Sequence, residues 1–455
     1  MDFDINPISR RQDASATAQN LSLRTMFDRR PTRQISVGND STGIVLIGGG
    51  LGGTTPAPVS VQTMTAGYTY EIDKCITEIN RLAAAGADIV RVAVPERKDT
   101  EALAEILNQT SVPIVADVHF HFKRALESVE AGVHKIRLNP GNIQDRGQVN
   151  AVIDACKDAK IPIRVGVNEG SIIERKDKEQ RKEELGKFFE KGNMGGKHAM
   201  LLALIIAKLE EYMDIFYERD FRDVSISCKS MDAAFTVAAY KEVSKRFDEP
   251  LHLGVTHAGP KETGAIRSIA ALAGLLTQGV GDTVRISYAS DPVFEVEDGL
   301  ELMYSLGLRE RKGVELIACP TCGRIQVDLF TLVQEVRQKL ADAITVPIKV
   351  AVMGCVVNGP GEAEGADVAV FAGNKRGIIY VQGERVANVS EAEILDRLLA
   401  ECVEFERKVL AGEAKLGEKV VEIVPPDPIG ELGSGIAKIA SGHVEKATGL
   451  TIKNT

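Results

Sequence analysis

Short apolar runs rich in β-branched residues recur along the chain up to residue 289. They occupy residues 59–64, 88–94, 113–120, 135–140, 162–168, 223–229, 251–256 and 283–289. Between them lie segments with the hydrophobic period of an amphipathic helix, such as EIDKCITEINRLAAAG (71–86) and GAIRSIAALAGLLTQG (264–279). Eight alternations of strand and helix are typical of a (β/α)8 barrel, so we predict a TIM barrel.

The pattern changes after about residue 300. A linker-like segment (306–316) is followed by helix patterns at 330–344 and 391–410 and by short strand patterns at 347–354, 367–373 and 376–383. These predict a second, smaller α/β domain. The expected division is a polar N-terminal extension (1–30), the barrel (31–305), the second domain (306–410) and a C-terminal tail without a core of its own (411–455).

Side chains alternate between the two faces of a strand, so each barrel strand divides into an apolar and a polar set. The apolar sets should meet the outer helices, which turns the polar sets inward. Those inward sets contain Arg91, Arg137, Asn139, Arg164, Asn168, Lys229, Arg285 and Ser287. Barrel interiors are usually filled by branched aliphatic side chains. Four arginines and a lysine on one inner surface are therefore unusual.

Burying an unpaired cation costs several kcal/mol, so an anion must balance this charge. Asp117, in the strand pattern ADVHFHF, can balance one of the five cations. The remaining positive charge predicts a phosphate or diphosphate ligand, because guanidinium groups bind phosphate oxygens bidentately. A purely internal ion-pair network is the alternative.

His119 and His121 lie two residues apart on the same strand and share the face of Asp117. Such a pair at the end of a barrel strand can bind zinc, which makes a zinc-dependent barrel hydrolase the rival hypothesis. Further strand-borne ligands in the expected order are missing, so hydrogen bonding to a substrate or to Asp117 is favoured. The other histidines form no readable constellation.

Composition narrows the class of protein. The chain has 455 residues and no tryptophan. Its net charge of -9 argues against a general nucleic-acid or membrane-surface binder. Its longest apolar run, AMLLALIIAKL (199–209), is too short to span a bilayer and predicts a buried helix. The N-terminus has no apolar signal core, so we expect a cytoplasmic protein.

Two local motifs have ordinary interpretations. The charged run at 174–192 predicts a solvated helix or loop. The glycine-rich GGGLGG (48–53) is followed by prolines rather than by the helix of a dinucleotide site.

Three of the seven cysteines lie among turn residues: Cys319 and Cys322 in ACPTCGRIQ, and Cys355 in AVMGCVVNGPGEAEG. Structural zinc would need a fourth Cys or His, and a redox dithiol would leave Cys355 without a role. An iron–sulfur cluster accepts three thiolates and one other ligand. The spacing alone leaves these three possibilities open. The other four cysteines lie in helix or strand patterns and are expected to be small buried side chains.

Several motifs together resemble the family of 4-hydroxy-3-methylbut-2-enyl diphosphate synthase, an iron–sulfur enzyme of isoprenoid biosynthesis. They are VSVQTMT, VADVHFHF, KIRLNPGN, IRVGVNEGS, LHLGVT, GVGDTVRIS, CPTCGR and VMGCVVNGPGE, in the family's order from about Arg30 to about residue 405. The resemblance implies reductive ring opening and dehydration of 2-C-methyl-D-erythritol 2,4-cyclodiphosphate. It also implies two electrons from reduced ferredoxin or flavodoxin, and a homodimer in which the second domain of one chain closes the barrel of the other.

The resemblance also assigns residues. It implies a [4Fe–4S] cluster held by Cys319, Cys322, Cys355 and, seven residues later, Glu362, a carboxylate that substrate can displace. It implies substrate binding by Arg91, Asp117, His119, Arg137, Asn139, Arg164, Asn168, Lys229, Arg285, Ser287 and Asn358.

One motif departs from the family pattern. Where the family usually reads TEAG, with a glutamate near the substrate, this chain reads THAGP and has His257. Histidine donates protons near neutral pH, so His257 is the expected proton donor, with Glu262 as a nearby alternative.

An iron–sulfur sensor that only binds a metabolite is the non-catalytic alternative, and it would form no product with a strong reductant.

Overall fold

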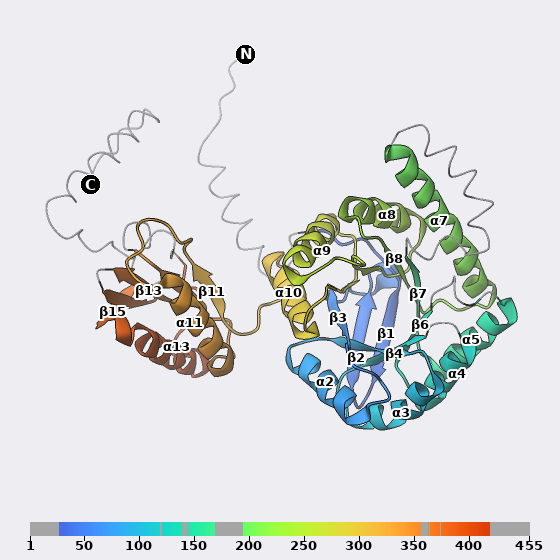
Figure 1. Cartoon of the computed structure of the whole chain (residues 1–455), viewed down its shortest axis with the longest axis horizontal. Helices are drawn as coiled ribbons and strands as arrows, with labels where there is room; N and C mark the ends of the chain where they lie inside the picture. The colour runs from blue at the N-terminus through green and yellow to red at the C-terminus, as the bar shows by residue number, and fades with distance from the viewer. Residues whose placement is uncertain are drawn as a thin grey trace, which may run out of the picture. The chain divides into compact units, whose positions relative to one another are not determined.

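A computed structural model describes residues 27–118, 121–138, 143, 145–168, 194–355, 363, 365–373 and 375–418, with the side chains of 194–197 and 342 not described. The chain divides into two compact units, Met1–Arg309 and Glu310–Thr455. Each hydrophobic core draws its buried residues from one unit only. We describe the units separately (Figure 1).

The first unit is built on eight parallel strands. They are β3 (Ser60–Met64), β4 (Ile89–Val94), β5 (Ile114–Val118), β6 (Lys135–Leu138), β7 (Ile163–Asn168), β8 (Val224–Lys229), β9 (His252–Leu253) and β10 (Thr283–Val284). Their order is β8-β7-β6-β5-β4-β3-β10-β9. A parallel bridge between Ile226 and Leu251 joins β8 to β9, so the sheet closes into a barrel. The predicted TIM barrel is confirmed.

In the described part of this unit, helices surround the strands (Figure 1). They are α2 (Ile72–Ala84), α3 (Arg97–Asn108), α4 (Phe122–Ala131), α5 (Arg146–Ala159), α7 (Met194–Glu218), α8 (Ala233–Arg246), α9 (Lys261–Leu276) and α10 (Pro292–Ser305). The apolar set of each strand packs against them in one core; on β4 this set is Val90, Val92 and Val94. The apolar run at 199–209 lies in α7, where Ile205 and Leu209 are fully buried, as predicted for a buried helix.

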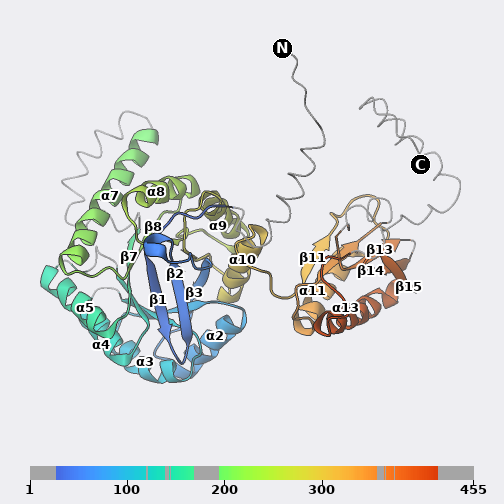
Figure 2. The same ribbon diagram turned by 180° about the vertical axis from the view of Figure 1, so that it is seen from behind.

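An antiparallel hairpin covers the amino-terminal end of the barrel (Figure 2). It consists of β1 (Gln34–Asn39) and β2 (Gly43–Gly48). Its buried side chains Ile35, Val37 and Ile47 pack against Ile89 and Val115, which lie near the beginnings of β4 and β5. The hairpin therefore seals this end, and the interior opens at the carboxyl ends of the strands, where TIM barrels hold their active sites.

The second unit contains a five-stranded sheet in the order β11-β12-β13-β14-β15. Its strands are β11 (Glu315–Ala318), β12 (Lys349–Met353), β13 (Val368–Gly373), β14 (Arg376–Val381) and β15 (Glu384–Ser390). The first three are parallel and the last two antiparallel to their neighbours. Helices α11 (Leu329–Ala343) and α13 (Ile394–Leu410) form one core with one face of this sheet. The predicted smaller α/β domain is confirmed.

Other sequence expectations have mixed outcomes. GGGLGG forms a single 3-10 turn, η1 (Leu51–Gly53), after which Thr54 is extended, so the helix of a dinucleotide site does not follow it. The charged run at 174–192 lies outside the described residues. In the described part of the chain, no helix has both the length and the apolar character needed to cross a bilayer.

Candidate active site

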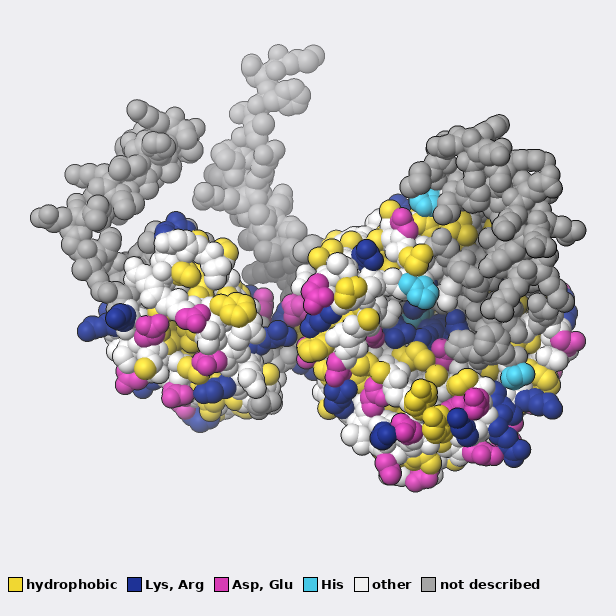
Figure 3. Space-filling model, viewed as in Figure 1, with side chains coloured by type: hydrophobic (Ala, Val, Ile, Leu, Met, Phe, Trp, Pro, Cys, Tyr) yellow, Lys and Arg dark blue, Asp and Glu magenta, His cyan; other side chains and the backbone are white. Residues whose placement is uncertain are grey.

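The inward face of the barrel carries the polar set of every long strand. Arg91, Arg137, Arg164 and Lys229 are each at least nine-tenths buried, and Arg285 and Ser287 follow β10 with partial exposure. The strand registers place Arg137 beside both Asp117 and Arg164, and Asn168 beside Lys229. Lys and Arg side chains gather near the middle of the barrel unit in the space-filling view (Figure 3).

Asp117 lies between two guanidinium groups. Its carboxylate accepts a hydrogen bond of 2.9 Å from Arg137 Nη1 and lies 3.4 Å from Arg91 Nε. We expected Asp117 to balance one cation, and it contacts two. Burial nevertheless lowers the pKa of Arg91 to about 9, because the nearby cations Arg285 and Arg137 offset part of the attraction of Asp117.

Arg285 has partners that sequence reasoning missed. Its Nη2 lies 3.4 Å from a carboxylate oxygen of Glu295, which reaches the barrel from α10. Burial raises the pKa of Glu295, whose carboxylate also accepts hydrogen bonds from Thr63 and from the backbone N–H of Tyr288. Glu295 is a helix residue, so the alternation of strand side chains gave no signal for it.

The thioether of Met64 lies between two guanidinium groups. Its sulfur is 3.1 and 2.9 Å from Nε and Nη2 of Arg91, and 3.8 Å from Nη1 of Arg285. Sulfur is a weak acceptor that carries no charge. Met64 therefore contacts both arginines without neutralising either.

Arg164 is the least compensated cation. Among the described residues, its Nε and Nη1 are buried without a hydrogen-bond partner. Burial, followed by the charges of Arg91 and Arg137, lowers its pKa well below the usual range. Unpartnered buried donors in a native structure require an explanation, and an oxyanion placed among these side chains would accept from them.

Two interior glycines make room for the cations. A Cβ atom at Gly166 would lie 3.0 Å from Ser227 Oγ and 3.3 Å from Arg137 Nε. A Cβ atom at Gly254 would lie 2.7 Å from Lys229 Nζ and 2.8 Å from the carbonyl oxygen of Arg285. Both positions lie on inward faces, where the long cationic side chains occupy the space that a side chain would otherwise fill.

The remaining predicted barrel residues have less defined surroundings. Ser287 donates a hydrogen bond of 3.1 Å to the carbonyl of Val255. His257 is exposed in the loop after β9 and has a φ of 52°, a left-handed conformation that is uncommon for residues other than glycine. Glu262 is exposed in the first turn of α9. His119, Asn139, Asn358 and Glu362 lie outside the described residues.

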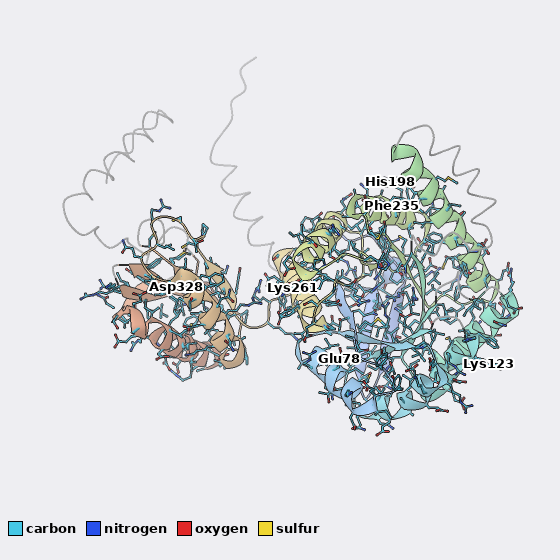
Figure 4. All side chains as sticks on the ribbon, viewed as in Figure 1. Glu78, Lys123, His198, Phe235, Lys261 and Asp328 are labelled. Carbon is cyan, nitrogen blue, oxygen red and sulfur yellow. The ribbon has the colours of Figure 1, made fainter. Side chains whose placement is uncertain are left out.

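Two of the other histidines have structural surroundings. The ring of His198 on α7 lies 5.2 Å from that of Phe235 on α8, and both are labelled in Figure 4. Nδ1 of the buried His134 accepts from the backbone N–H of Ile114. His121, half of the pair considered for zinc, is the exposed N-cap residue of α4.

The turn cysteines lie at one edge of the sheet in the second unit. Cys319 follows β11 and Cys355 follows β12, and these adjacent strands are parallel. The backbone N–H of Gly354 donates to Cys319 Sγ at 3.2 Å. Cys322 is exposed in the loop that leads to Asp328, the N-cap residue of α11 labelled in Figure 4.

This donor set fits an iron–sulfur cluster in its chemistry. Cys319 and Cys322 lie in the loop after β11, and Cys355 lies after the neighbouring parallel strand β12. Cys319 already accepts the kind of N–H hydrogen bond that tunes cluster sulfurs. Within the ranges that the structure describes, no three His, Cys, Asp or Glu side chains are gathered closely enough to hold a metal ion. The other four cysteines are buried, and burial raises the pKa of each of their thiols, as expected for structural residues.

Comparisons with known proteins place the chain in a family. Residues 32–300 match the model of the GcpE TIM-barrel domain, and residues 315–404 match that of the GcpE protein C-terminal domain. A solved N-acetylneuraminic acid synthetase from Leptospira borgpetersenii covers 62% of this chain and 92% of its own, at 11% identity and a TM-score of 0.40, which is too low to inform the site.

Several curated relatives carry the name 4-hydroxy-3-methylbut-2-en-1-yl diphosphate synthase (flavodoxin), and three of them serve as examples. The relative from Corynebacterium glutamicum is 42% identical over 86% of this chain and 97% of its own. That from Symbiobacterium thermophilum is 43% identical over 82% and 93%, and that from Mycobacterium tuberculosis is 44% identical over 83% and 90%. The family models and these relatives cover both units, and the chain therefore belongs to the GcpE family.

Proposed function

We propose that this chain is a 4-hydroxy-3-methylbut-2-en-1-yl diphosphate synthase that acts on 2-C-methyl-D-erythritol 2,4-cyclodiphosphate. The names of its relatives support the activity. In the reaction, one ring C–O bond and one C–OH bond break, a C=C bond forms, two electrons are taken up, and a proton completes the departing water. The hydroxyl oxygen departs as water, and the product is an allylic diphosphate.

The observation that carries the substrate assignment is the uncompensated positive charge of the barrel interior. Arg164 has two unpartnered buried nitrogens, and Lys229 contacts no carboxylate in the described part of the chain. Two carboxylates, those of Asp117 and Glu295, pair with three arginines, Arg91, Arg137 and Arg285, so one positive charge remains in excess. A diphosphate supplies several acceptor oxygens and the missing negative charge. Asn168 and Ser287 add neutral hydrogen-bonding groups, as His119, Asn139 and Asn358 do in this proposal.

The proposal assigns the redox chemistry to the second unit. Cys319, Cys322 and Cys355 would hold a [4Fe–4S] cluster with Glu362 as the fourth ligand. When bound, such a cluster supplies electrons one at a time to the substrate. His257 would supply the proton, since a histidine ring nitrogen can carry a proton and donate it.

The partners belong to the same proposal. Flavodoxin is the electron donor that the names of the relatives give, which favours it over ferredoxin. We also propose a cytoplasmic reaction, which a donor of this kind supports, and a homodimer. The expected domain bounds, 31–305 and 306–410, remain part of the proposal. Light scattering coupled to size-exclusion chromatography measures the oligomeric state directly.

The decisive experiment is an anaerobic assay of the reconstituted full chain with the cyclodiphosphate and reduced flavodoxin. We expect product formation together with bound iron and sulfide. Arg164→Leu should lose binding of the cyclodiphosphate, whereas Arg33→Leu, outside the barrel interior, should retain it. Protein that contains iron and sulfide but forms no product with a strong reductant would instead be a sensor, and protein without iron would contradict the cluster.

A further inference from the structure

Lys229 and His252 meet inside the barrel. They lie on the inward faces of the neighbouring strands β8 and β9, with Lys229 Nζ 3.3 Å from His252 Nε2. Lys229 is 8% exposed and His252 is fully buried. This pair belongs to the interior that binds the diphosphate in the proposed function.

The backbone of His252 is fixed independently of its ring. Tyr240, a fully buried residue of α8, donates its hydroxyl hydrogen to the carbonyl oxygen of His252 at 2.6 Å. The same hydroxyl oxygen accepts from the backbone N–H of Cys228, the residue before Lys229, at 3.2 Å. One tyrosine therefore ties together the two strands that carry the pair.

The imidazole ring has a single polar partner in the described part of the chain. Its Nδ1 is buried and unpartnered there, and its Nε2 faces Lys229. A neutral imidazole has one donor and one acceptor nitrogen. Nε2 can accept from a protonated Lys229 or donate to a neutral one, so one hydrogen lies between the two nitrogens in either state, and the pair as a whole carries one more proton when Lys229 is charged.

The path of the Lys229 side chain depends on Gly254, two residues after His252 on the same inward face. A Cβ atom at position 254 would lie 2.7 Å from Lys229 Nζ and 3.0 Å from its Cε. Any other residue would therefore collide with the amine where it now lies. The absence of a side chain at Gly254 lets the amine reach His252.

The charges that face the pair are almost all positive. Arg164 of β7, Arg285 after β10, Arg91 of β4, and Arg137 and Lys135 of β6 surround it. The carboxylates of Asp117 and Glu295 are engaged by Arg91, Arg137 and Arg285. Burial first, and these cations second, lower the pKa of Lys229 and of His252 well below their usual ranges.

We propose that His252 is a positioning residue that holds the Lys229 amine toward the ligand, and that this amine takes up a proton from solvent when the diphosphate binds. This inference rests on the proposed function for the identity of the natural ligand. In the step, the nitrogen lone pair of Lys229 accepts one proton, an N–H bond forms, and the resulting ammonium contacts the anion. No bond of the ligand changes.

The physical reason is a change in the charge that surrounds the amine. In the free protein the neighbouring cations disfavour an ammonium, whereas a bound dianion favours it and raises the pKa of Lys229. Between the pKa of the free protein and the higher pKa of the complex, each binding event takes up about one proton. Below the first value the amine is already charged, and above the second it stays neutral, so no uptake occurs.

Calorimetry of the full-length holoenzyme under anaerobic conditions tests this inference. The cyclodiphosphate is titrated in buffers of different ionisation enthalpy across the range from pH 6 to pH 9, and the slope of observed against buffer enthalpy gives the protons taken up. Sulfate serves as a second probe. Both anions are fully ionised in this range, so the protons cannot come to rest on the ligand.

The variants separate the amine from its positioning residue. Lys229→Arg should bind both anions and take up about one proton fewer per binding event than the wild type, because a guanidinium holds its proton to a higher pH than an amine does. His252→Leu should weaken binding about tenfold and move the lower limit of the uptake window about one pH unit down, because the amine loses an acceptor for its hydrogen. His252→Gln, whose amide oxygen can accept, should restore both values toward those of the wild type.

Thr283→Val is the matched control. Thr283 is buried, lies beside His252 in the strand register, and has a side-chain oxygen without a partner in the described residues. This variant should keep the proton uptake of the wild type. Uptake in Lys229→Arg that equals that of the wild type, or a His252→Leu protein that matches Thr283→Val, contradicts the inference. So does ligand binding by the wild type without uptake at any pH.

The two probes distinguish this inference from the proposed function. Sulfate binding with proton uptake, in a protein that ignores the cyclodiphosphate, would remove the proposed substrate and leave the Lys229–His252 pair intact. Turnover of the cyclodiphosphate without proton uptake on binding would contradict the role of the Lys229–His252 pair and leave the proposed substrate intact. Wild-type protein that binds neither anion would overturn both.

Discussion

At the scale of single residues, Asp117 is the carboxylate on which the charge balance of the barrel depends. It contacts Arg137 at 2.9 Å and Arg91 at 3.4 Å, and all three side chains are at least nine-tenths buried. A buried ion pair adds little net stability when it is intact, because desolvation offsets the attraction. Removing one partner is costly because it leaves the other charge uncompensated.

Asp117→Asn should therefore reduce the free energy of unfolding by about 3 kcal/mol at pH 7. The asparagine keeps the shape of the side chain but leaves two guanidinium groups without a counter-charge. Urea denaturation followed by circular dichroism measures the loss. Asp154→Asn is the control, because Asp154 pairs with Arg219 at the surface, where an ion pair contributes about 0–1 kcal/mol. Equal effects of the two substitutions would contradict this account.

Lys135 illustrates the opposite case, a cation whose removal should stabilise the fold. It is 1% exposed at the start of β6, and burial, followed by the charge of Arg164, lowers its pKa well below the usual range. Because the folded-state pKa is lower than the unfolded one, the residue destabilises the fold below the unfolded pKa. The penalty disappears as the pH rises through that value, about 10.4.

Lys135→Met should accordingly raise the free energy of unfolding by about 1–3 kcal/mol at pH 7. The difference from the wild type should shrink when the pH is raised to 9.5. Nearer the unfolded-state pKa, keeping the Lys135 amine neutral in the folded protein costs less free energy of unfolding. Denaturation curves at both pH values measure this change. A gain that stays constant with pH would point to packing rather than to charge.

Side-chain alternation placed most of the candidate site on the inward face, because the direction of a strand side chain is set locally. The same alternation, extended to LHLGVT, puts His252 and Gly254 on that face and could have singled out the pair with Lys229. The partners of Arg285 were beyond this reasoning. Glu295 comes from a helix, and the sulfur of Met64 has no charge that would mark it as a partner for arginine.

At the scale of elements, the hairpin of β1 and β2 was missed. Its strands have the alternation of a half-buried hairpin, but this segment was considered only for a possible nucleotide motif, GGGLGG, which begins at the end of β2. Only the tertiary structure shows that Ile35, Val37 and Ile47 contact Ile89 and Val115. The short β9 and β10 were predicted longer, because a pattern of side chains cannot show where the hydrogen-bond ladder ends.

Ile35→Ala tests whether the hairpin stabilises the barrel. The side chain is 2% exposed, so its truncation should leave a cavity and cost about 2–4 kcal/mol of unfolding free energy. Ile44→Ala on the same hairpin is the control, because Ile44 is 58% exposed and its loss should change stability by about 0.5 kcal/mol or less. Both variants should keep the ligand affinity of the wild type, since the hairpin lies at the end opposite the proposed binding residues.

At the scale of the whole molecule, the chemistry is divided between two units with separate cores. The cations that would hold the diphosphate belong to the barrel unit, and the three turn cysteines belong to the unit that begins at Glu310. The change of pattern after residue 300 was enough to predict two domains, because each domain must bury its own apolar surface.

The separate cores predict two transitions in scanning calorimetry. Phe405 is 1% exposed in the core of the second unit, so Phe405→Ala should cost about 3–5 kcal/mol there and lower the transition of that unit alone. Sulfate should raise only the transition of the barrel unit, because the cations that would hold it lie there, and a ligand stabilises the unit that binds it in proportion to the logarithm of its concentration over its Kd. Val403→Ala, at a position 46% exposed on the same helix, should move neither transition. If Phe405→Ala and the ligand shifted the same transition, the two cores would unfold as one, and binding in the barrel would then also stabilise the cysteine-bearing sheet.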